Sequence, residues 1–284
     1  MPQSLGNVYV HLLVSTREGR PFLADRSLRR GLHGYLTGIC RNLECPSLRI
    51  GGIDDHVHVL LRLSREQAIA RLVQELKEGS TSWLRSQRRV KDFNWQDGYS
   101  AFSVSPENVG KAVRYIENQA KLHRNETFAD EYRGLLQKCG GHPQRTNVHL
   151  VFSTKNRFPF LSDKNVRRLL HDQLAEICDS LDCPALRVGG VEDHVHILYR
   201  LSQGRELAEV SREVKKTSST WLVTRRDIRN FDWQDGYGAF SVSPQHEAAV
   251  MRYIESQEEH HRHETFAEEC RRFLRIKGSA TRTE

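Results

Sequence analysis

The 284-residue sequence lacks any long apolar run. No stretch approaches the ~20 consecutive apolar residues that a membrane-spanning helix needs, so we expect no membrane partner. The first residues, MPQSLGNVYVHLLVSTREGR, also lack a basic stretch followed by an apolar segment, which is the pattern of a secretory signal. The sequence therefore predicts a cytoplasmic protein with reduced thiols.

Cysteine is sparse, and its positions do not form a typical metal or disulfide pattern. Two of the six cysteines, Cys40 and Cys45, recur as Cys178 and Cys183 with the same spacing. Cys40 and Cys178 occupy apolar positions of helical patterns, where a small thiol commonly packs in a core. We therefore expect buried thiols, with a zinc site or a disulfide as the less favoured alternative.

The charge balance is moderately basic. Lys and Arg total 43 against 36 for Asp and Glu, which gives a formal net charge of +7 and a pI near 9.2. This excess favours a polyanionic partner, with nucleic acid as the first candidate. Because 38% of the residues are hydrophobic, the chain can also build packed cores.

One segment of the sequence occurs twice, at a constant offset of 138 residues. GGIDDHVHVLLRLS aligns with GGVEDHVHILYRLS, and NWQDGYSAFSVSP aligns with DWQDGYGAFSVSP. The match runs over about 125 residues without insertion or deletion, which indicates two copies of one domain. We predict copy one at 1–138, a linker containing Gly and Pro at 139–145, copy two at 146–276 and a polar tail at 277–284.

The sequence pattern of each copy predicts a strand, a helix, a β-hairpin, a second helix, a short strand and a last helix, in that order. In copy two these are NVHLVFST, KNVRRLLHDQLAEICDSL, ALRVGGVEDHVHILYRL, GRELAEVSREVKKTSSTWLVTRR, FSVSP and QHEAAVMRYIESQEEHHR. Ser243 stands where it could cap the last helix. This order predicts an α+β fold of ferredoxin-like type, an antiparallel sheet with helices packed on one face.

Two histidines lie two residues apart on the second strand of each predicted hairpin. They are His56 and His58 in copy one, and His194 and His196 in copy two. Residues two apart on a strand project from the same face, so each pair presents two imidazoles together. Such a pair can bind a divalent ion that keeps open positions, and the preceding aspartate could support it. An ordinary surface or hydrogen-bonded pair is the alternative.

A tyrosine and a glutamine four residues apart share one face of the last predicted helix in each copy. These are Tyr115 with Gln119, and Tyr253 with Gln257. The glutamine oxygen could complete a metal site made by the two histidines, one turn from a phenol that could act as a nucleophile. Core packing, the usual role of a helical tyrosine, is the alternative.

Together these motifs resemble the single-tyrosine HUH transposases, which include the transposases of small insertion sequences and the REP-associated tyrosine transposases. The resemblance rests on DHVH, WQDGYGAFSVSP, and YIENQ or YIESQ with the later HHRHETF, and it covers nearly all of both copies. It implies ferredoxin-like (RRM-like) domains with Tyr115 and Tyr253 as nucleophiles. It also implies Mg²⁺ or Mn²⁺ sites made by His56, His58 and Gln119 in copy one, and by His194, His196 and Gln257 in copy two.

The resemblance further implies a strand transferase that acts on single-stranded DNA with hairpin ends. Tyrosine attack would give a covalent 5′-phosphotyrosine and a free 3′-hydroxyl, and a second 3′-hydroxyl could reverse the step without ATP. A phenol with a pKa near 10 needs help at neutral pH, and a divalent metal would polarise the scissile phosphate. The sequence assigns no general base, and it gives no role to His123, His260, His261 and His263.

Basic residues on and just after the second predicted helix of each copy could track DNA phosphates, with a solvated helix face as the alternative. On the same helices, Trp83 and Trp221 are expected in the core, with base stacking as the alternative. Trp95 and Trp233 lie in a glycine-containing loop that we expect to shape the site. The candidate DNA contacts are Lys77, Arg85, Arg88 and Arg89, with Lys215, Lys216, Arg225 and Arg226.

Members of the family that the sequence resembles usually carry one copy and work as homodimers. We therefore expect this chain to form an intramolecular pseudo-dimer and to act as a monomer. In single-copy relatives the tyrosine helix can reach across the dimer, so we expect each site to combine the histidines of one copy with the tyrosine of the other. Two self-sufficient copies are the alternative.

Two other functions remain open at this point. A domesticated protein could bind hairpins or folded single strands without moving them, although both copies keep their tyrosine and histidines. An HUH relaxase or replication initiator is the second alternative. In those enzymes the tyrosine is usually followed by a lysine rather than a glutamine, which disfavours this alternative.

Overall fold

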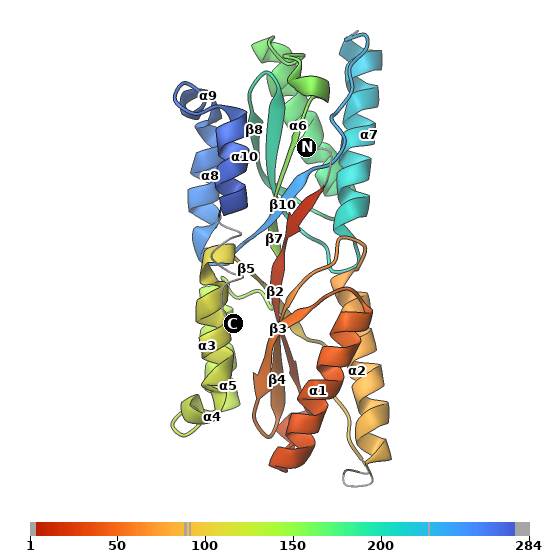
Figure 1. Ribbon diagram of the computed structural model, residues 1–284, viewed down its shortest axis with the longest axis vertical. Coiled ribbons are helices and arrows are strands. Elements are labelled where there is room, and N and C mark those ends of the chain that lie inside the picture. Colours follow the sequence, from red (N-terminus) through yellow and green to blue (C-terminus); the bar gives the residue numbers. More distant parts are fainter. Residues whose placement is uncertain (1–3, 88–89, 91, 227, 276–284) are drawn as a thin grey trace.

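The computed structural model describes residues 4–87, 90, 92–226 and 228–275, so the predicted tail at 277–284 lies outside it. Two halves, each built around one five-stranded sheet, lie end to end along the long axis of the molecule (Figure 1). Each half corresponds to one copy of the repeat. Within the described ranges, no helix is both long and apolar enough to cross a membrane.

Each half has the predicted ferredoxin-like order of strands and helices, and a matching strand order in its sheet. The first half runs β2 (Tyr9–Ser15), α1 (Arg26–Asn42), β3 (Ser47–Gly52), β4 (His56–Arg62), α2 (Ile69–Ser86), β5 (Ser100–Val104), α3 (Val109–Glu117), α4 (Gln119–Leu122) and α5 (Phe128–Lys138). Its sheet order is β3-β4-β2-β5, with antiparallel neighbours.

The second half repeats this arrangement, with sheet order β8-β9-β7-β10. It runs β7 (Asn147–Ser153), α6 (Lys164–Ser180), β8 (Ala185–Gly190), β9 (His194–Arg200), α7 (Leu207–Arg226), β10 (Gly238–Val242), α8 (Glu247–Glu255), α9 (Gln257–His260) and α10 (Phe266–Arg275). The predicted last helix of each copy is thus divided, at Asn118 and at Ser256, and a further helix follows it.

The central strands are buried on both faces, which the prediction of helices on one face did not include. On β4, Val57 and Val59 belong to the core under α1 and α2, whereas Leu60 packs with Ile116 of α3 on the opposite face. Figure 1 shows α1 and α2 on one side of the sheet and α3 to α5 on the other. An almost continuous apolar strand, HVHVLLR, needs cover on both faces, and the tyrosine-bearing helix supplies the second cover.

The two halves exchange short edge strands. Strand β1 (Leu5–Asn7), just before β2, pairs in parallel with β10 of the second half. Strand β6 (Gln144–Arg145), at the end of the predicted linker, pairs in the same way with β5 of the first half. Each sheet therefore has a fifth strand that belongs to the chain segment leading into the other sheet.

Serines of the repeated FSVSP motif join the halves where β5 lies beside β10. Ser103 Oγ donates to the carbonyl of Val242 at 2.6 Å, and Ser241 Oγ donates to the carbonyl of Val104 at 2.6 Å. Each hydroxyl also accepts a backbone N–H, from Asn147 at 3.0 Å and from Tyr9 at 2.9 Å respectively. The chain is therefore a pseudo-dimer with near two-fold symmetry.

Two further serines exchange bonds across the same boundary. The Ser105 amide donates to Ser243 Oγ and the Ser243 amide donates to Ser105 Oγ, both at 2.7 Å. The expectation that Ser243 caps the helix after it is wrong, because its side chain makes no capping bond. A backbone amide of the opposite half is its partner instead.

We predict that Ser103→Ala combined with Ser241→Ala lowers the free energy of unfolding by about 1–3 kcal/mol for each serine, because each change leaves buried amide and carbonyl groups unpaired. Urea unfolding followed by circular dichroism measures this loss. Ser82→Ala on α2 is the matched control, since Ser82 is exposed. Equal urea midpoints for the double variant and the control would contradict the role of these serines.

The cysteines are free thiols, as expected. Cys40, Cys45, Cys178 and Cys183 are fully buried in the main core. Burial raises the pKa of Cys40 and of Cys178 to about 12, so these thiols stay protonated. They fill space between sheet and helices.

Candidate active site

The two histidines of β4 face the tyrosine-bearing helix. His56, His58 and Leu60 alternate along the strand with core residues and so share the face that α3 covers. Both imidazoles are completely buried. In the second half, β9 places His194 and His196 in the same way, also completely buried.

The helix segment α3–α4 brings the tyrosine and the glutamine to these histidines. Gln119 Oε1 lies 3.0 Å from His56 Nε2, and the ring centroid of Tyr115 lies 5.8 Å from that of His58. In the second half, Gln257 Oε1 lies 3.4 Å from His194 Nε2, and the Tyr253 ring lies 5.9 Å from the His196 ring. The predicted groups of each copy therefore meet in one place.

A glutamate that the sequence analysis did not single out completes the first cluster. Glu131 of α5 is 3% exposed, and its carboxylate oxygens lie 3.4 Å from His56 Nε2 and 3.3 Å from His58 Nε2. It accepts hydrogen bonds from the Tyr115 hydroxyl and, at 2.7 Å, from the Gln119 amide. Glu131 thus links the nucleophile candidate to the ligand candidates.

The second half contains the equivalent glutamate, Glu269 of α10. It is completely buried and lies 3.4 Å from His196 Nε2, and the Tyr253 hydroxyl donates to it. A repeated glutamate in ETFADEY and ETFAEEC was the signal available in the sequence. The spacing alone could not show that a separate helix folds back over the histidines.

Two histidines without a predicted role also join the clusters. His123 Nε2 lies 3.2 Å from Gln119 Oε1 and 3.0 Å from Glu131 Oε2. His261 Nε2 lies 3.0 Å from Gln257 Oε1. Each stands four residues after its glutamine, so the helical face that predicted the Tyr–Gln pair could also have predicted them.

The outer nitrogens of the paired histidines are held by hydrogen bonds. His56 Nδ1 bonds to Asp55 at 2.7 Å, and His58 Nδ1 lies 2.9 Å from Nε2 of His11 on β2. The second half repeats both contacts through Asp193 and His149. The support expected from the preceding aspartate is thus present at His56 and His194, and together with the contacts from His11 and His149 it leaves each Nε2 facing the cluster.

The clusters have the donors and the unpaired atoms of a cation site. One donor atom from each of His56, His58 and Glu131 lies within 4.8 Å of the others, as do those of His194, His196, His261 and Glu269. The Nε2 atoms of His58 and His196 are buried and have no hydrogen-bond partner among the residues that the structure describes. Imidazole, amide and carboxylate groups gathered in this way could hold a divalent metal ion.

The electrostatics of the cluster keep the tyrosines protonated in the absence of a cation. Burial and the hydrogen bond to Glu131 raise the pKa of Tyr115, and burial and the charge of Glu269 raise the pKa of Tyr253. Burial lowers the pKa of His58, and lowers that of His196 to about 4, so these imidazoles are neutral. Neutral imidazole is the form that binds a metal.

The glycine pair before each histidine strand lets the tyrosine helix approach. A Cβ on Gly51 would lie 2.8 Å from the Ile116 carbonyl oxygen of α3, and one on Gly189 would lie 2.4 Å from that of Ile254. Gly52 has φ +149°, and a Cβ there would lie 2.1 Å from the His56 carbonyl oxygen. These glycines therefore allow the tyrosine helix to lie close to the strands that precede and carry the histidines.

Comparison with protein families gives two matches to the family described as "Transposase IS200 like", at residues 4–119 and 143–257. This chain belongs to the IS200-like transposase family. The resemblance inferred from the sequence is thus confirmed, and the two matches agree with the tandem pseudo-dimer. Both end at the glutamine of the cluster, so the glutamates of α5 and α10 lie beyond the matched residues.

Solved structures similar to this IS200-like transposase include two proteins matched over less than half of its length. A protein described as a candidate transposase of Deinococcus radiodurans R1 is 25% identical, with 39% of this chain and 89% of that chain covered and a TM-score of 0.32. A REP-associated tyrosine transposase bound to a REP hairpin is 14% identical, with coverages of 43% and 72% and a TM-score of 0.34. The comparison with curated proteins gave no match.

Each site of this IS200-like transposase assembles within one half. Tyr115 and Gln119 lie with His56 and His58, and the second set lies together in the second half. The expected exchange of tyrosine helices between halves is not the arrangement of this structure. Each tyrosine helix packs instead on its own half, where α3 approaches β3 and α8 approaches β8 closely at the glycines.

The predicted DNA-contacting residues differ in their surroundings. Lys77 Nζ donates to the carbonyls of Gln96 and Gly98, and Lys215 Nζ donates to those of Gln234 and Gly236, so these lysines tie the WQDG loop to α2 and α7. Arg85 donates to Asn94 at 3.0 Å and is exposed, as is Lys216. Arg88 and Arg89, and the side chains of Arg225 and Arg226, lie outside the described part of the chain.

The tryptophans pack away from the histidine clusters. Trp95 and Trp233 are buried in the main core, where each indole N–H donates to a serine of α2 or α7. The expectation that these two residues shape the site is wrong, because the core beneath α2 and α7 lies on the other face of the sheet. Trp83 and Trp221 pack against the same core, as expected.

Proposed function

We propose that this IS200-like transposase cleaves and rejoins single-stranded DNA with hairpin ends through covalent bonds to Tyr115 and Tyr253. The observation that carries the proposal is the same in both halves. In each half, a tyrosine hydroxyl donates to the glutamate of a buried cluster that also contains two histidines and a glutamine. In the first half, an open pocket lies beside this tyrosine. A tyrosine that served packing alone would not need these partners.

The cluster would hold Mg²⁺ or Mn²⁺. The residues in place are His56, His58, Gln119 and Glu131 in the first half, and His194, His196, Gln257 and Glu269 in the second, where His261 lies within the same distance. The buried Nε2 atoms of His58 and His196, which make no hydrogen bond within the described part of the chain, support this assignment. A bound divalent ion would polarise the scissile phosphate and offset the negative charge that builds on its oxygens.

The chain's own groups would perform the transfer as follows. The tyrosine oxygen forms a bond to the scissile phosphorus, while the bond from phosphorus to the 3′ oxygen breaks. The tyrosine loses its proton, and a proton ends on the 3′ oxygen as a free hydroxyl. Because the phosphotyrosine keeps the phosphodiester bond energy, a 3′-hydroxyl of another strand can attack it and restore both the tyrosine and a DNA strand.

DNA would reach the site as a single strand, with duplex hairpins held elsewhere on the surface. Exposed basic residues on and after α2 and α7, including Arg85 and Lys216, are candidates for those phosphate contacts. Because the two halves share exchanged strands and buried serine contacts, we propose that one chain is the functional unit.

Removing the metal distinguishes the proposed cleavage of DNA from a function that consists of hairpin binding alone. With excess EDTA, or with all four paired histidines changed to Ala, cleavage of a labelled pool of hairpin-bearing single strands should fall below about one hundredth of its rate with Mg²⁺. Retention of the same pool in a native gel should change little, because binding relies on phosphate and shape contacts.

Restoring Mg²⁺ after EDTA is the control for intact protein. Full cleavage in excess EDTA would contradict the metal proposal. Retention of DNA without cleavage under all conditions would favour the domesticated binding protein instead.

A further inference from the structure

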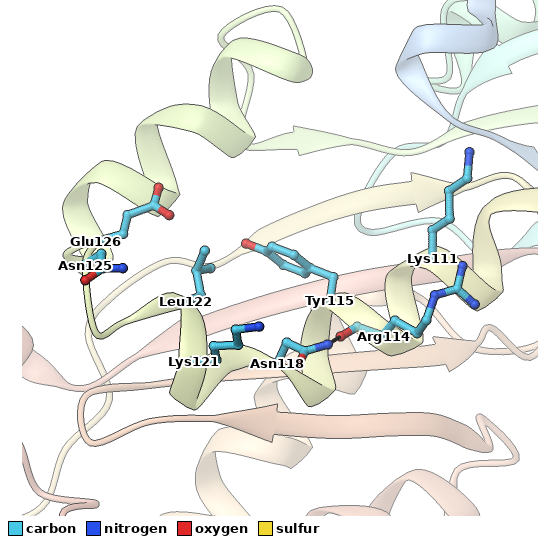
Figure 2. Close-up of a pocket in the computed structure, with 8 residues that line it drawn as sticks. All are labelled: Lys111, Arg114, Tyr115, Asn118, Lys121, Leu122, Asn125 and Glu126. Carbon is cyan, nitrogen blue, oxygen red and sulfur yellow. Dashed lines mark hydrogen bonds between the residues drawn. The ribbon is translucent and has the colours of Figure 1, made fainter.

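The two tyrosine sites of the chain have different entrances. In the first half, Lys111, Arg114 and Lys121 line an open pocket beside Tyr115, together with Asn118, Leu122, Asn125 and Glu126. Figure 2 shows the three basic side chains along α3 and α4 around the tyrosine. All three are exposed, and among the residues that the structure describes none has an acidic group within ion-pair distance. Their charge is thus available to a ligand.

The second half does not keep this basic entrance. At the offset of 138 residues, Lys111 is replaced by Ala249 and Lys121 by Glu259, and only Arg114 is matched, by Arg252. Of the three basic positions, one stays basic, one becomes acidic and one becomes alanine. Because the remaining core of the site is the same in both halves, the difference concerns what approaches from outside.

The second tyrosine is also covered by a side chain that the first half lacks. Arg272 donates to the Tyr253 hydroxyl at 2.9 Å, and its guanidinium carbon lies 5.3 Å from the centre of the tyrosine ring. Glu264 and His260 hold that guanidinium, each at 3.1 Å. The equivalent of Arg272 in the first half is Gly134, and the equivalent of His260 is Leu122. An arginine cover of this kind is therefore specific to Tyr253.

We propose that Lys111, Arg114 and Lys121 form a phosphate-binding groove that seats the single strand to be cut, so that the two sites of one chain are unequal and Tyr115 reacts before Tyr253. Lys111 of α3 and Lys121 of α4 are ten residues apart, and the helical rise per residue separates them by up to about 15 Å, which is long enough to contact more than one phosphate. Arg272 keeps the Tyr253 site closed until it is displaced. The order of reaction rests on the proposed tyrosine chemistry, whereas the groove does not.

The groove is tested by binding alone. In a chain with Tyr115→Phe and Tyr253→Phe, fluorescence anisotropy measures the affinity for labelled oligo(dT) over a range of salt concentrations. Adding Lys111→Ala and Lys121→Ala should weaken binding about tenfold at low salt. It should also reduce the slope of log affinity against log salt by about 0.7 for each phosphate that the protein no longer neutralises.

Arg30→Ala with Arg41→Ala is the matched control, because both arginines are exposed on α1, across the sheet from the pocket, and the change in net charge is the same. An equal fall in affinity in this control would overturn the groove, since net charge alone would then explain the effect. An unchanged affinity in the lysine variant would overturn it as well.

The inequality is tested by locating the covalent adducts. The unaltered chain is incubated with Mg²⁺ and a pool of hairpin-bearing single strands with randomised flanks, and tyrosine adducts are quantified over time by peptide mass spectrometry. Adducts at Tyr115 should appear first, and Arg272→Gly should increase the early share at Tyr253. Equal rates at the two tyrosines, or earlier reaction of Tyr253, would overturn the inequality. No adduct at either tyrosine would instead reject the proposed function and with it the order of reaction, while the binding test still decides the groove.

Discussion

Replacing Tyr115 and Tyr253 together by Phe should abolish the covalent protein–DNA adduct, and each single replacement should remove the adduct at that tyrosine only. Phenylalanine keeps the ring contacts with the histidine beside it but lacks the attacking oxygen. The measurement is a denaturing gel with labelled DNA, followed by peptide mass spectrometry. Because the attacking oxygen is removed from both sites, the double variant should show only background signal.

Tyr132→Phe is a suitable control for this experiment. Tyr132 lies on α5, next in sequence to Glu131, but its hydroxyl contacts Ser100 rather than the histidine cluster. Its replacement should leave both adducts in place. An adduct that survives in the double variant would mean that another residue is the nucleophile.

Paired variants should show that each half is self-sufficient. A chain with His56→Ala and Tyr115→Phe carries both defects in one site, so the adduct at Tyr253 should remain. A chain with His56→Ala and Tyr253→Phe carries one defect in each site, so both adducts should disappear. The first variant should form at least about 100-fold more total adduct than the second. Loss of a histidine that helps to stabilise the charge developing at the phosphate has an effect of this size.

The measurement must use protein shown to be monomeric, because a second chain could complement a damaged site. His56→Ala alone is the reference, and it should form its adduct only at Tyr253. The opposite outcome, with adduct retained by His56→Ala plus Tyr253→Phe, would mean that the tyrosine helices exchange between halves during the reaction.

Local periodicity and the internal repeat were enough to predict most of the fold. They also predicted the histidines, the tyrosine and the glutamine that meet in each half. His56 and His58 are two residues apart, which places them on one face of a strand. Tyr115 and Gln119 are four apart, which places them on one face of a helix. Which residues share a face of a strand or helix does not depend on the tertiary structure. The gapless offset between copies predicted two equivalent domains. These inferences needed only contacts that are near in sequence.

Most of the contacts that escaped prediction are distant in sequence. Glu131 reaches the histidines because α5 folds back over the strand, and no spacing between Glu131 and His56 encodes that path. The exchange of β1 and β6 depends on two-residue and three-residue strands, which are too short for a periodic signal. Cis assembly likewise depends on which half each tyrosine helix packs against, and no residue spacing encodes that choice.

The parallel pairing of β1 with β10 has a consequence for synthesis of the chain. Leu5 pairs with Gly238, so the segment that contains Leu5 must wait until a segment made 233 residues later has left the ribosome. At ordinary rates of translation this delay is roughly 10–50 s. Strand β6 follows β5 far sooner, so the first sheet can be completed while β1 still extends from it unpaired. Strand β1 should therefore dock last, after the other strands of both sheets have paired.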